Sequence, residues 1–489
     1  MPDRSELLKC LPAHRDLFYG GAWHAPLEGQ YRPTLDPAFG TPLAEVAEAG
    51  RSDVDAAVAA ARSGFRTWAA LKPLERAALM RQAARVLRDH AEEFALIDAL
   101  NTGNPVAQMV ADAHVAAASI EYFAGLVGEL KGQTIPMGGG NLNYTIREPL
   151  GVVARIVAYN HPLMFAGTKI GAPLAAGNSL IIKAAAQAPL SALRLAELIG
   201  GIFPAGVLNV VCGGTDCGEA LSEHPGIAAV SLIGSVPTGR AVMRSASATL
   251  KPVILELGGK NALIAFPDCD PETVADGAVR GMNFTWAGQS CGSTSRLFVH
   301  ADIHDAVAER VAALVAERHR PGLPTDPATT MGPLVSAAQF DKVMHYIATG
   351  KAEGARIVCG GARPADPALK DGWFVEPTIF ADVSPDMTIA REEVFGPILS
   401  ILRWTDEEEM FDAVNALEYG LTAAIFTRDL NTAHRAASRV EAGYVWVNNV
   451  SEHFLGAPFG GYKQSGLGRE ESLEEMYEFS QTKNVNIRF

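Results

Sequence analysis

Residues 151–183 read GVVARIVAYNHPLMFAGTKIGAPLAAGNSLIIK, and this stretch decides the fold class. It begins with a β-branched, apolar run of the kind that forms a buried parallel strand. A helix-like segment follows, and NSLIIK then has the pattern of a second strand. Strand, helix and strand in this order predict two parallel strands with the helix packed on one face of the sheet.

The same alternation continues to about residue 256, with strands predicted in VLNVV (207–211) and AAVSLI (228–233). We therefore predict a Rossmann-type unit at about 150–256, preceded by a mostly helical first 130 residues. A second α/β series runs from 261 to 449. Its strand candidates are RLFVH, ARIVCG, LSILRW, TAAIFTR and GYVWVNN.

Composition narrows the class of protein. The chain has 489 residues, of which 48% are hydrophobic and 20% charged, so it can bury two or three cores. A net charge of -14 disfavours nucleic acid and anionic membranes as partners. Six scattered cysteines predict no disulfide framework and no metal site. The charged N-terminus and the lack of about 18 to 20 consecutive apolar residues predict a cytoplasmic protein.

Cys291 is the candidate nucleophile. It lies in NFTWAGQSCGSTSRL (283–297), where small neighbours leave room for a substrate. A nucleophilic thiol must ionise, and backbone N–H groups at a helix start would lower its pKa and hold an oxyanion.

Two further polar residues stand where an α/β enzyme needs them. Glu256 lies among apolar residues in VILELGGKNALI (253–264), and such surroundings raise the pKa of a carboxyl group toward that of a general base. Asn160 follows the strand GVVARIVAY, where ligands bind in α/β sheets, and its amide could donate to an oxyanion.

Three glycine-containing turns complete the set of motifs. IGSVPTGR (233–240) follows a strand and opens a helix, which suits a pyrophosphate. The spacing alone assigns no chemistry to EEVFGPIL (392–399) or to PFGGYKQSGLGRE (458–470).

Together these segments resemble the aldehyde dehydrogenase superfamily, from about residue 20 to the C-terminus. The motifs occur in family order: the YNHP turn, APLAAGNSLIIK, IGSVPTG, ELGGK, GQSC, and EEVFGP followed by PFGGYKQSGLGRE. The resemblance implies oxidation of an aldehyde to a carboxylic acid with NAD(P) and water, through a thioester. It implies Cys291 as nucleophile, Glu256 as the base for the deacylating water, and Asn160 as an oxyanion donor.

The resemblance also implies a cofactor site, without a metal. Lys183 would contact a cofactor ribose, Glu393 the nicotinamide ribose, and Phe395 the nicotinamide end. The other residues expected along the cofactor are Ile156, Tyr159, Gly214, Gly218, Gly234 and Ser235.

Departures from the family pattern bear on specificity. Ala186 stands where the family often has a glutamate that binds the adenosine ribose; we expect NAD, with NADP possible. Trp286 replaces the common asparagine before the cysteine, and His161 follows Asn160. By motif alignment the expected substrate tunnel is lined by His161, Phe165, Thr285, Trp286 and His453, which suits a polar or aromatic aldehyde.

The implied organisation has three parts: a cofactor-binding domain (1–125 and 148–257), a catalytic domain (258–450) and an oligomerisation element (126–147 and 465–489). We expect a two-stranded arm at 126–147 and a terminal strand, QTKNVNIRF, that could add to a neighbouring subunit's sheet. A homodimer and a homotetramer both fit. Two rival functions remain open: a CoA-acylating aldehyde dehydrogenase, and a non-catalytic protein on the same scaffold.

Overall fold

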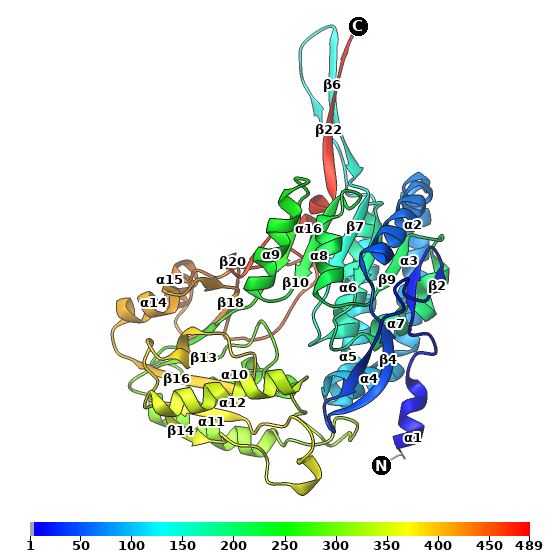
Figure 1. Cartoon of the computed structure of the whole chain (residues 1–489). Coiled ribbons are helices and arrows are strands. Elements are labelled where there is room, and N and C mark those ends of the chain that lie inside the picture. The colour runs from blue at the N-terminus through cyan, green and yellow to red at the C-terminus, as the bar shows by residue number, and fades with distance from the viewer. Residues whose placement is uncertain (1–3) are drawn as a thin grey trace.

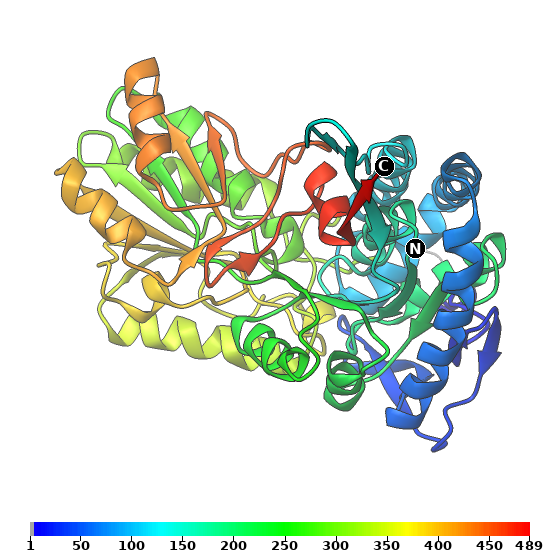
Figure 2. The same cartoon turned by 90° about the horizontal axis from the view of Figure 1, so that it is seen from above.

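The structure is a computed structural model that describes residues 4–489. It consists of two α/β bodies, each built around a mostly parallel sheet, and a narrow arm that projects from the first body (Figure 1). Figure 2 shows the two bodies side by side from above. Two large buried cores correspond to the bodies, one from residues up to Leu257 with Met476 and Phe479 near the C-terminus, the other from residues after Asn261.

The first sheet confirms the α/β alternation predicted from residues 151–256. Five parallel strands form its centre, and they are buried because helices cover both faces. In spatial order the parallel strands are β9 (Leu208–Val211), β8 (Ser179–Lys183), β7 (Val152–Ile156), β10 (Ala229–Ile233) and β11 (Val253–Glu256). Short antiparallel strands complete the edges: β1 (Leu17–Tyr19), β2 (Ala22–His24) and β21 (Gly466–Leu467).

Helices around this sheet come from both the N-terminal region and the crossovers. Trp68 anchors one of them, because its ring is fully buried against Phe203 and its Nε1–H donates to the carbonyl of Leu174. The helices are α1 (Arg4–Leu7), α2 (Arg51–Ala70), α3 (Pro73–Asp89), α4 (Ala91–Thr102), α5 (Val106–Gly125), α6 (Pro162–Ala175), α7 (Leu190–Ile199), α8 (Thr215–Glu223) and α9 (Val236–Ser247). A separate hairpin joins β3 (Tyr31–Asp36) to β4 (Thr41–Ala47).

The second sheet has seven strands, of which only the edge strand β14 is antiparallel. Their spatial order is β14 (Arg356–Cys359), β15 (Thr378–Ala381), β16 (Ile398–Trp404), β13 (Arg296–His300), β12 (Ala262–Ala265), β18 (Thr422–Phe426) and β19 (Tyr444–Val447). The sequence predicts five of these. It misses β12 and β15.

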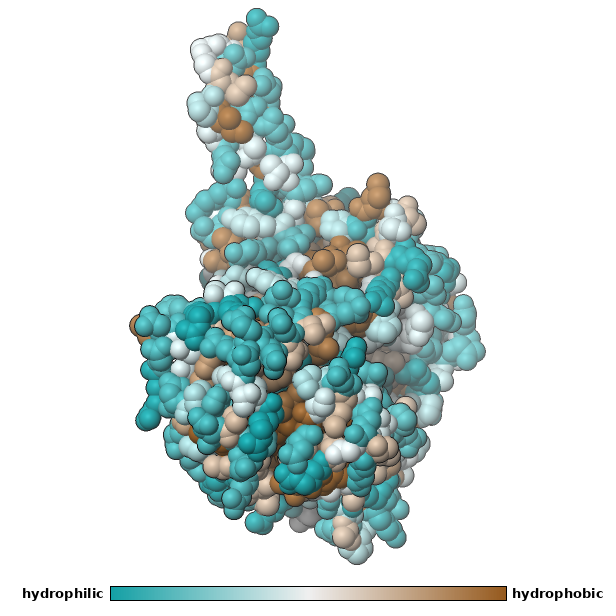
Figure 3. Space-filling view, turned by 90° about the vertical axis from the view of Figure 1, so that its left-hand side faces the viewer, coloured by the Kyte–Doolittle hydropathy of each residue, from teal (hydrophilic) through white to brown (hydrophobic). Residues whose placement is uncertain are grey.

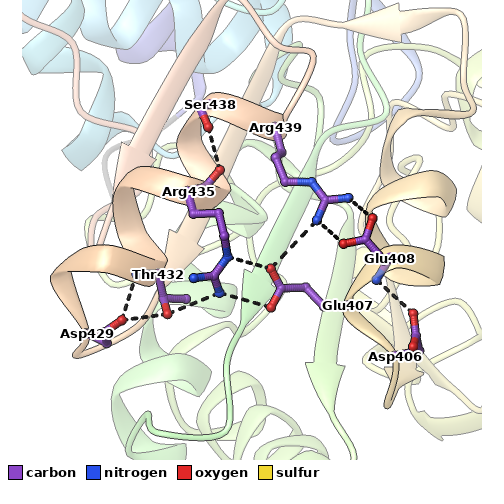
Figure 4. A network of polar contacts seen from close by, with 8 residues as sticks. All are labelled: Asp406, Glu407, Glu408, Asp429, Thr432, Arg435, Ser438 and Arg439. Carbon is purple, nitrogen blue, oxygen red and sulfur yellow. Dashed lines mark hydrogen bonds and ion pairs between the residues drawn. The ribbon is translucent and has the colours of Figure 1, made fainter.

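The helices of the second body are α10 (Pro271–Gly281), α11 (His304–Arg318), α12 (Ala337–Ala352), α13 (Thr388–Arg391), α14 (Glu407–Asn415) and α15 (Leu430–Arg439). Exposed ion pairs join α14 to α15: Arg435 contacts Glu407 at 3.0 Å, and Arg439 contacts Glu408 at 2.6 Å (Figure 4). Such surface pairs contribute at most about 1 kcal/mol each.

The projecting arm is a three-stranded sheet, which corrects two expectations. It contains β5 (Thr134–Ile135), β6 (Asn141–Pro149) and the C-terminal β22 (Ser480–Arg488). β22 pairs antiparallel with β6 along all nine residues of each strand, so the terminal strand has a partner within its own chain. The short helix α16 (Leu473–Glu478) brings the chain back beside Pro149, and this long-range return leaves no local sequence signal.

Within residues 4–489, no helix is long and apolar enough to cross a membrane, and all six cysteines are free thiols.

Candidate active site

A cavity of about 1100 Å³ lies at the carboxyl ends of the parallel strands of the first sheet. Ile156, Lys183 and Glu256 end three of these strands and line it, as the general rule for ligand sites in α/β sheets requires. Residues of the second body, among them Cys291, Gln339 and Glu393, form another part of its wall. The cavity brings together every predicted catalytic and cofactor residue: Ile156, Tyr159, Asn160, Lys183, Gly214, Gly218, Gly234, Ser235, Glu256, Cys291, Glu393 and Phe395.

Cys291 lies in an irregular turn between a 3-10 helix (Phe284–Trp286) and β13. The side-chain amide of Asn261 fixes this turn by donating to the carbonyl oxygens of Cys291 (2.7 Å) and Ser293 (3.0 Å). No helix begins at Cys291, so the expected helix start at the thiol is wrong.

The electrostatics of the thiol also differ from the sequence expectation. Burial, followed by the negative charges of Glu256 and Glu393, raises the pKa of Cys291 to about 12. The backbone N–H groups of Cys291 and Gly292 act in the opposite direction, but their effect is smaller. The thiol is therefore neutral at pH 7 in this state of the cavity, and a positive charge placed nearby would favour its ionisation.

Glu256 ends β11 and is 5% exposed. Among the residues that the structure describes, none bonds to either of its two buried carboxylate oxygens. Burial and then the charge of Glu470 raise the pKa of Glu256 well above its usual range, while Lys169 acts to lower it. This is the raised pKa that the sequence predicts for a carboxyl group suited to general-base chemistry.

A buried charge network stands behind Glu256, and sequence reasoning missed it. Glu470 is bonded by Nζ of Lys169 and by Nη2 of Arg155 (2.9 Å). Arg155 also bonds Glu475 through both Nη atoms, at 3.1 and 3.2 Å. Although burial opposes ionisation, Lys169 and Arg155 lower the pKa of Glu470, which therefore holds a negative charge near Glu256.

One feature of the sequence indicates part of this network. Lys169 is the only charged residue in the apolar stretch HPLMFAGTKIGAPLAAG, and a lone buried lysine requires a carboxylate partner. Glu470 ends the motif PFGGYKQSGLGRE, which the spacing left unassigned.

Asn160 lies in the turn between β7 and α6 and is 5% exposed. Its carbonyl oxygen accepts a hydrogen bond from the side chain of Asn104 at 2.7 Å, which fixes the backbone of the turn. The ring of the preceding residue, Tyr159, packs edge-on against Phe395 with 6.0 Å between centroids. A hydrogen bond from Asn104 and a ring contact with Phe395 thus both stabilise the turn.

The N-termini of two helices, with their backbone N–H groups, also line the cavity. Gly214 caps α8, and Ser235 caps α9, with its side chain accepting from the backbone N–H of Thr238. Helix N-termini attract phosphate groups. Gly218 and Gly234 have no side chains and therefore add little bulk to this wall. A Cβ on Gly218 would lie 3.9 Å from Ile156.

Two charged side chains that line the same cavity, Lys183 and Glu393, suit the two riboses of a dinucleotide. Nζ of Lys183 makes no hydrogen bond or ion pair with any described residue, and burial lowers its pKa. Glu393 accepts from the backbone N–H of Gly259 through Oε1 at 3.1 Å. The lining residues therefore fit a nicotinamide dinucleotide. No group of residues in 4–489 could hold a metal ion.

Arg32 and Glu48 also line the cavity, beside Ala186, and sequence reasoning missed both. Nη2 of Arg32 donates to the carbonyl of Ala186 at 2.6 Å, and its Nε lies 3.3 Å from Glu48. Glu48 accepts from the backbone N–H of Gly214 at 2.5 Å. A cation and an anion thus flank the position where the expected ribose-binding glutamate is absent.

Three of the five expected tunnel residues lie together. The ring of His161 packs edge-on against Phe165 (5.8 Å between centroids) and Trp286 (4.8 Å). Thr285 is half-buried in the same 3-10 helix as Trp286. His453 belongs to a different aromatic group, where it packs against Phe459 at 4.6 Å, and among residues 4–489 it shares no ring contact with His161 or Trp286.

Comparisons with known proteins agree with this geometry. The family model described as "Aldehyde dehydrogenase family" matches residues 23–485. The chain is 53% identical to aldehyde dehydrogenase tropH of Talaromyces stipitatus, over 99% of this chain and 96% of that protein.

Solved structures of similar chains include an indole-3-acetaldehyde dehydrogenase, AldA of P. syringae, as a cysteine-to-alanine mutant with NAD+ and IAA. It is 37% identical, with a TM-score of 0.96 and 99% of each chain covered. The NAD+ complex of an aldehyde dehydrogenase from Bacillus cereus is 38% identical, with a TM-score of 0.95, covering 100% of this chain and 99% of that one.

Proposed function

This chain belongs to the aldehyde dehydrogenase family and is an NAD(P)-dependent enzyme, and we propose that it oxidises a polar or aromatic aldehyde to the carboxylic acid through a covalent intermediate on Cys291. Water, rather than CoA, takes the acyl group. The three residues that carry the chemistry are Cys291, Glu256 and Asn160.

In the first half of the reaction Cys291 releases its thiol proton to solvent water, and the resulting thiolate forms a bond between its Sγ and the carbonyl carbon of the aldehyde. The carbonyl oxygen gains the negative charge, and the Asn160 amide and the backbone N–H of Cys291 donate to it. When bound, the oxidised nicotinamide supplies the acceptor for the hydrogen and the two electrons that leave the former aldehyde carbon. Cys291 is then joined to the acyl group as a thioester.

The second half of the reaction is hydrolysis. Glu256 takes a proton from water, the water oxygen adds to the thioester carbon, and the carbon–sulfur bond breaks. The sulfur of Cys291 leaves with the bonding electrons, and the carboxylic acid is released. Aldehyde, NAD(P)+ and water thus become acid, NAD(P)H and a proton.

The observation that carries the proposal is the unpaired, buried Glu256 in the cavity that also contains Cys291 and Asn160. An enzyme that transfers its acyl group to CoA needs no base for water, so Glu256 favours hydrolysis. A non-catalytic protein would have no reason to keep two unsatisfied carboxylate oxygens in its core.

For the cofactor we propose NAD as the main form, with NADP also accepted. The Glu48 carboxylate beside Gly214 could serve the ribose hydroxyls in place of the missing glutamate at position 186. Arg32 lines the same part of the cavity as Ala186, and its guanidinium could accommodate the additional phosphate of NADP.

For the assembly we propose a homodimer or homotetramer built through the arm. Aliphatic side chains are exposed on all three strands of the arm: Ile135, Leu142, Ile146 and Ile487. Figure 3 shows hydrophobic residues scattered over the otherwise mostly hydrophilic arm. A small sheet of three strands needs a packed hydrophobic face for its stability, which favours a partner surface over these exposed side chains. We also propose that the chain divides into a cofactor-binding domain, a catalytic domain and an oligomerisation element that contains the arm.

The test is a screen for NAD(P)H release over chemically diverse aldehydes, with and without CoA. We expect turnover without CoA, and Cys291→Ala should abolish it while NAD binding, measured by calorimetry, remains. Turnover that requires CoA would overturn the hydrolytic step, and activity that persists in Cys291→Ala would overturn the covalent mechanism.

A further inference from the structure

His161 has a fixed orientation next to the oxyanion donor Asn160. Nδ1 of His161 lies 2.8 Å from Oδ2 of Asp112 on α5. Because an ionised carboxylate only accepts hydrogen bonds, Nδ1 is the donor in this contact. His161 is 8% exposed and Asp112 is 4% exposed, so the pair is nearly free of competing water.

The second ring nitrogen of His161 has no protein partner. Among residues 4–489 no hydrogen bond to Nε2 occurs, and Nε2 is not among the unpaired nitrogens that are sealed from solvent. Part of its surface therefore remains accessible. The neighbours of the imidazole are aromatic, since Trp286 and Phe165 both pack edge-on against it.

The charges that face His161 are negative. Asp112 on α5 contacts it directly, and Asp98 on α4 acts from farther away. Although burial opposes the charged form, these two carboxylates raise the pKa of His161. The pKa of Asp98 is itself raised to about 7 by burial, so Asp112 is the main counter-ion at neutral pH. A cationic imidazole donates from both nitrogens, and Nε2–H is the free donor.

We propose that His161, oriented by Asp112, binds an anionic oxygen on the ring of an aromatic aldehyde while Trp286 packs against that ring. The inference rests on the proposed function and narrows its substrate class to aryl aldehydes that carry a carboxylate or a phenolate. Asp112 is a positioning residue, because it acts through His161.

The shared chemistry of these substrates is a charged oxygen acceptor, and a long alkyl chain offers none. A neutral aryl aldehyde of the same shape would contact the aromatic side chains but leave Nε2–H unpaired. A donor with a full charge that loses its acceptor costs about tenfold to a hundredfold in binding.

The experiment compares 4-carboxybenzaldehyde, 4-hydroxybenzaldehyde and 4-methylbenzaldehyde as substrates with NAD. We expect wild-type kcat/KM to favour at least one of the first two over the methyl compound by tenfold or more. His161→Phe should remove this preference through KM, with the methyl compound changed less than threefold. Asp112→Asn should weaken the preference, and His161→Gln, whose amide still donates, should retain part of it.

The pH dependence provides a second readout. Because the cation is lost as the pH rises through the pKa of His161, the preference for 4-carboxybenzaldehyde, whose charge is constant, should fall at high pH. His224→Phe removes another histidine–aspartate pair, with Asp55 at 3.1 Å, away from the cavity, and should leave the preference unchanged.

The outcomes separate the inference from the function on which it rests. Equal rates for the charged and the methyl compounds, or a preference that survives His161→Phe, would overturn the inference while leaving the dehydrogenase intact. A uniform loss of kcat on all three substrates would show that His161 only supports the Asn160 turn, and would also overturn it. Absence of NAD(P)H release from every aldehyde tested would overturn the proposed function itself.

Discussion

The buried network behind Glu256 makes a strong prediction about Arg155. This side chain is 0% exposed, and it neutralises both Glu470 and Glu475 while stacking on Phe479 at 4.7 Å. In the variant Arg155→Met, Glu470 still has Lys169, but Glu475 keeps only the backbone N–H of Glu471. A buried carboxylate then remains without a cation.

The expected cost follows from burial. Removing one partner of a buried ion pair destabilises a protein by about 3 to 5 kcal/mol, because the remaining charge stays desolvated. The double variant Arg155→Met/Glu475→Gln removes that charge and should recover at least half of the loss. The matched control is Arg435→Met, which breaks the exposed contact with Glu407 and should cost about 1 kcal/mol or less.

The measurement is urea unfolding of the three variants and the wild type, with free energies compared at a common slope. A loss in Arg155→Met no larger than the loss in Arg435→Met would refute the reasoning. So would a double variant that is less stable than Arg155→Met, because the desolvated Glu475 could not then be the cause.

Three further predictions concern the cavity. Glu470→Gln removes a negative charge that raises the pKa of Glu256, so the pH of half-maximal deacylation should move down in single-turnover kinetics; no shift or an upward shift would contradict this. Arg32→Ala should weaken the binding of NADP about fivefold in calorimetry, as expected for the loss of a half-exposed cation, and should change the binding of NAD less than twofold. Equal losses of affinity for the two cofactors would contradict this prediction. Because the pKa of Cys291 is raised to about 12, its alkylation by iodoacetamide without cofactor should accelerate steadily from pH 7 to 10, and a plateau in mass-spectrometric rates below pH 9 would contradict this.

The sequence predicts much of the sheet and of the cavity for a common physical reason. Parallel strands that are covered on both faces become continuous apolar runs, and polar residues that interrupt such a run at its carboxyl end lie at one edge of the sheet. By this argument the sequence places Asn160 at a ligand site, whereas Glu256 is singled out by its apolar neighbours and Lys183 only by the resemblance to the family.

Contacts between distant segments could not be predicted in this way. Lys169 and Glu470 are 301 residues apart, and only the folded chain brings them together. The same applies to β22, whose partner β6 precedes it by more than 300 residues. The pKa of Cys291 depends on burial and then on the charges of Glu256, at the end of β11, and Glu393, in a distant loop, so the expectation from local backbone donors had the wrong direction.

The most direct test of the account is to trap the acyl group on the protein. Glu256→Gln keeps the shape of the side chain but removes the proposed base, so the thioester should form and persist when the variant is mixed with NAD and an aldehyde substrate. Intact and peptide mass spectrometry should then find the added acyl mass on the peptide that contains Cys291. An adduct on any other cysteine, or continued turnover without an adduct, would contradict the central role of Cys291.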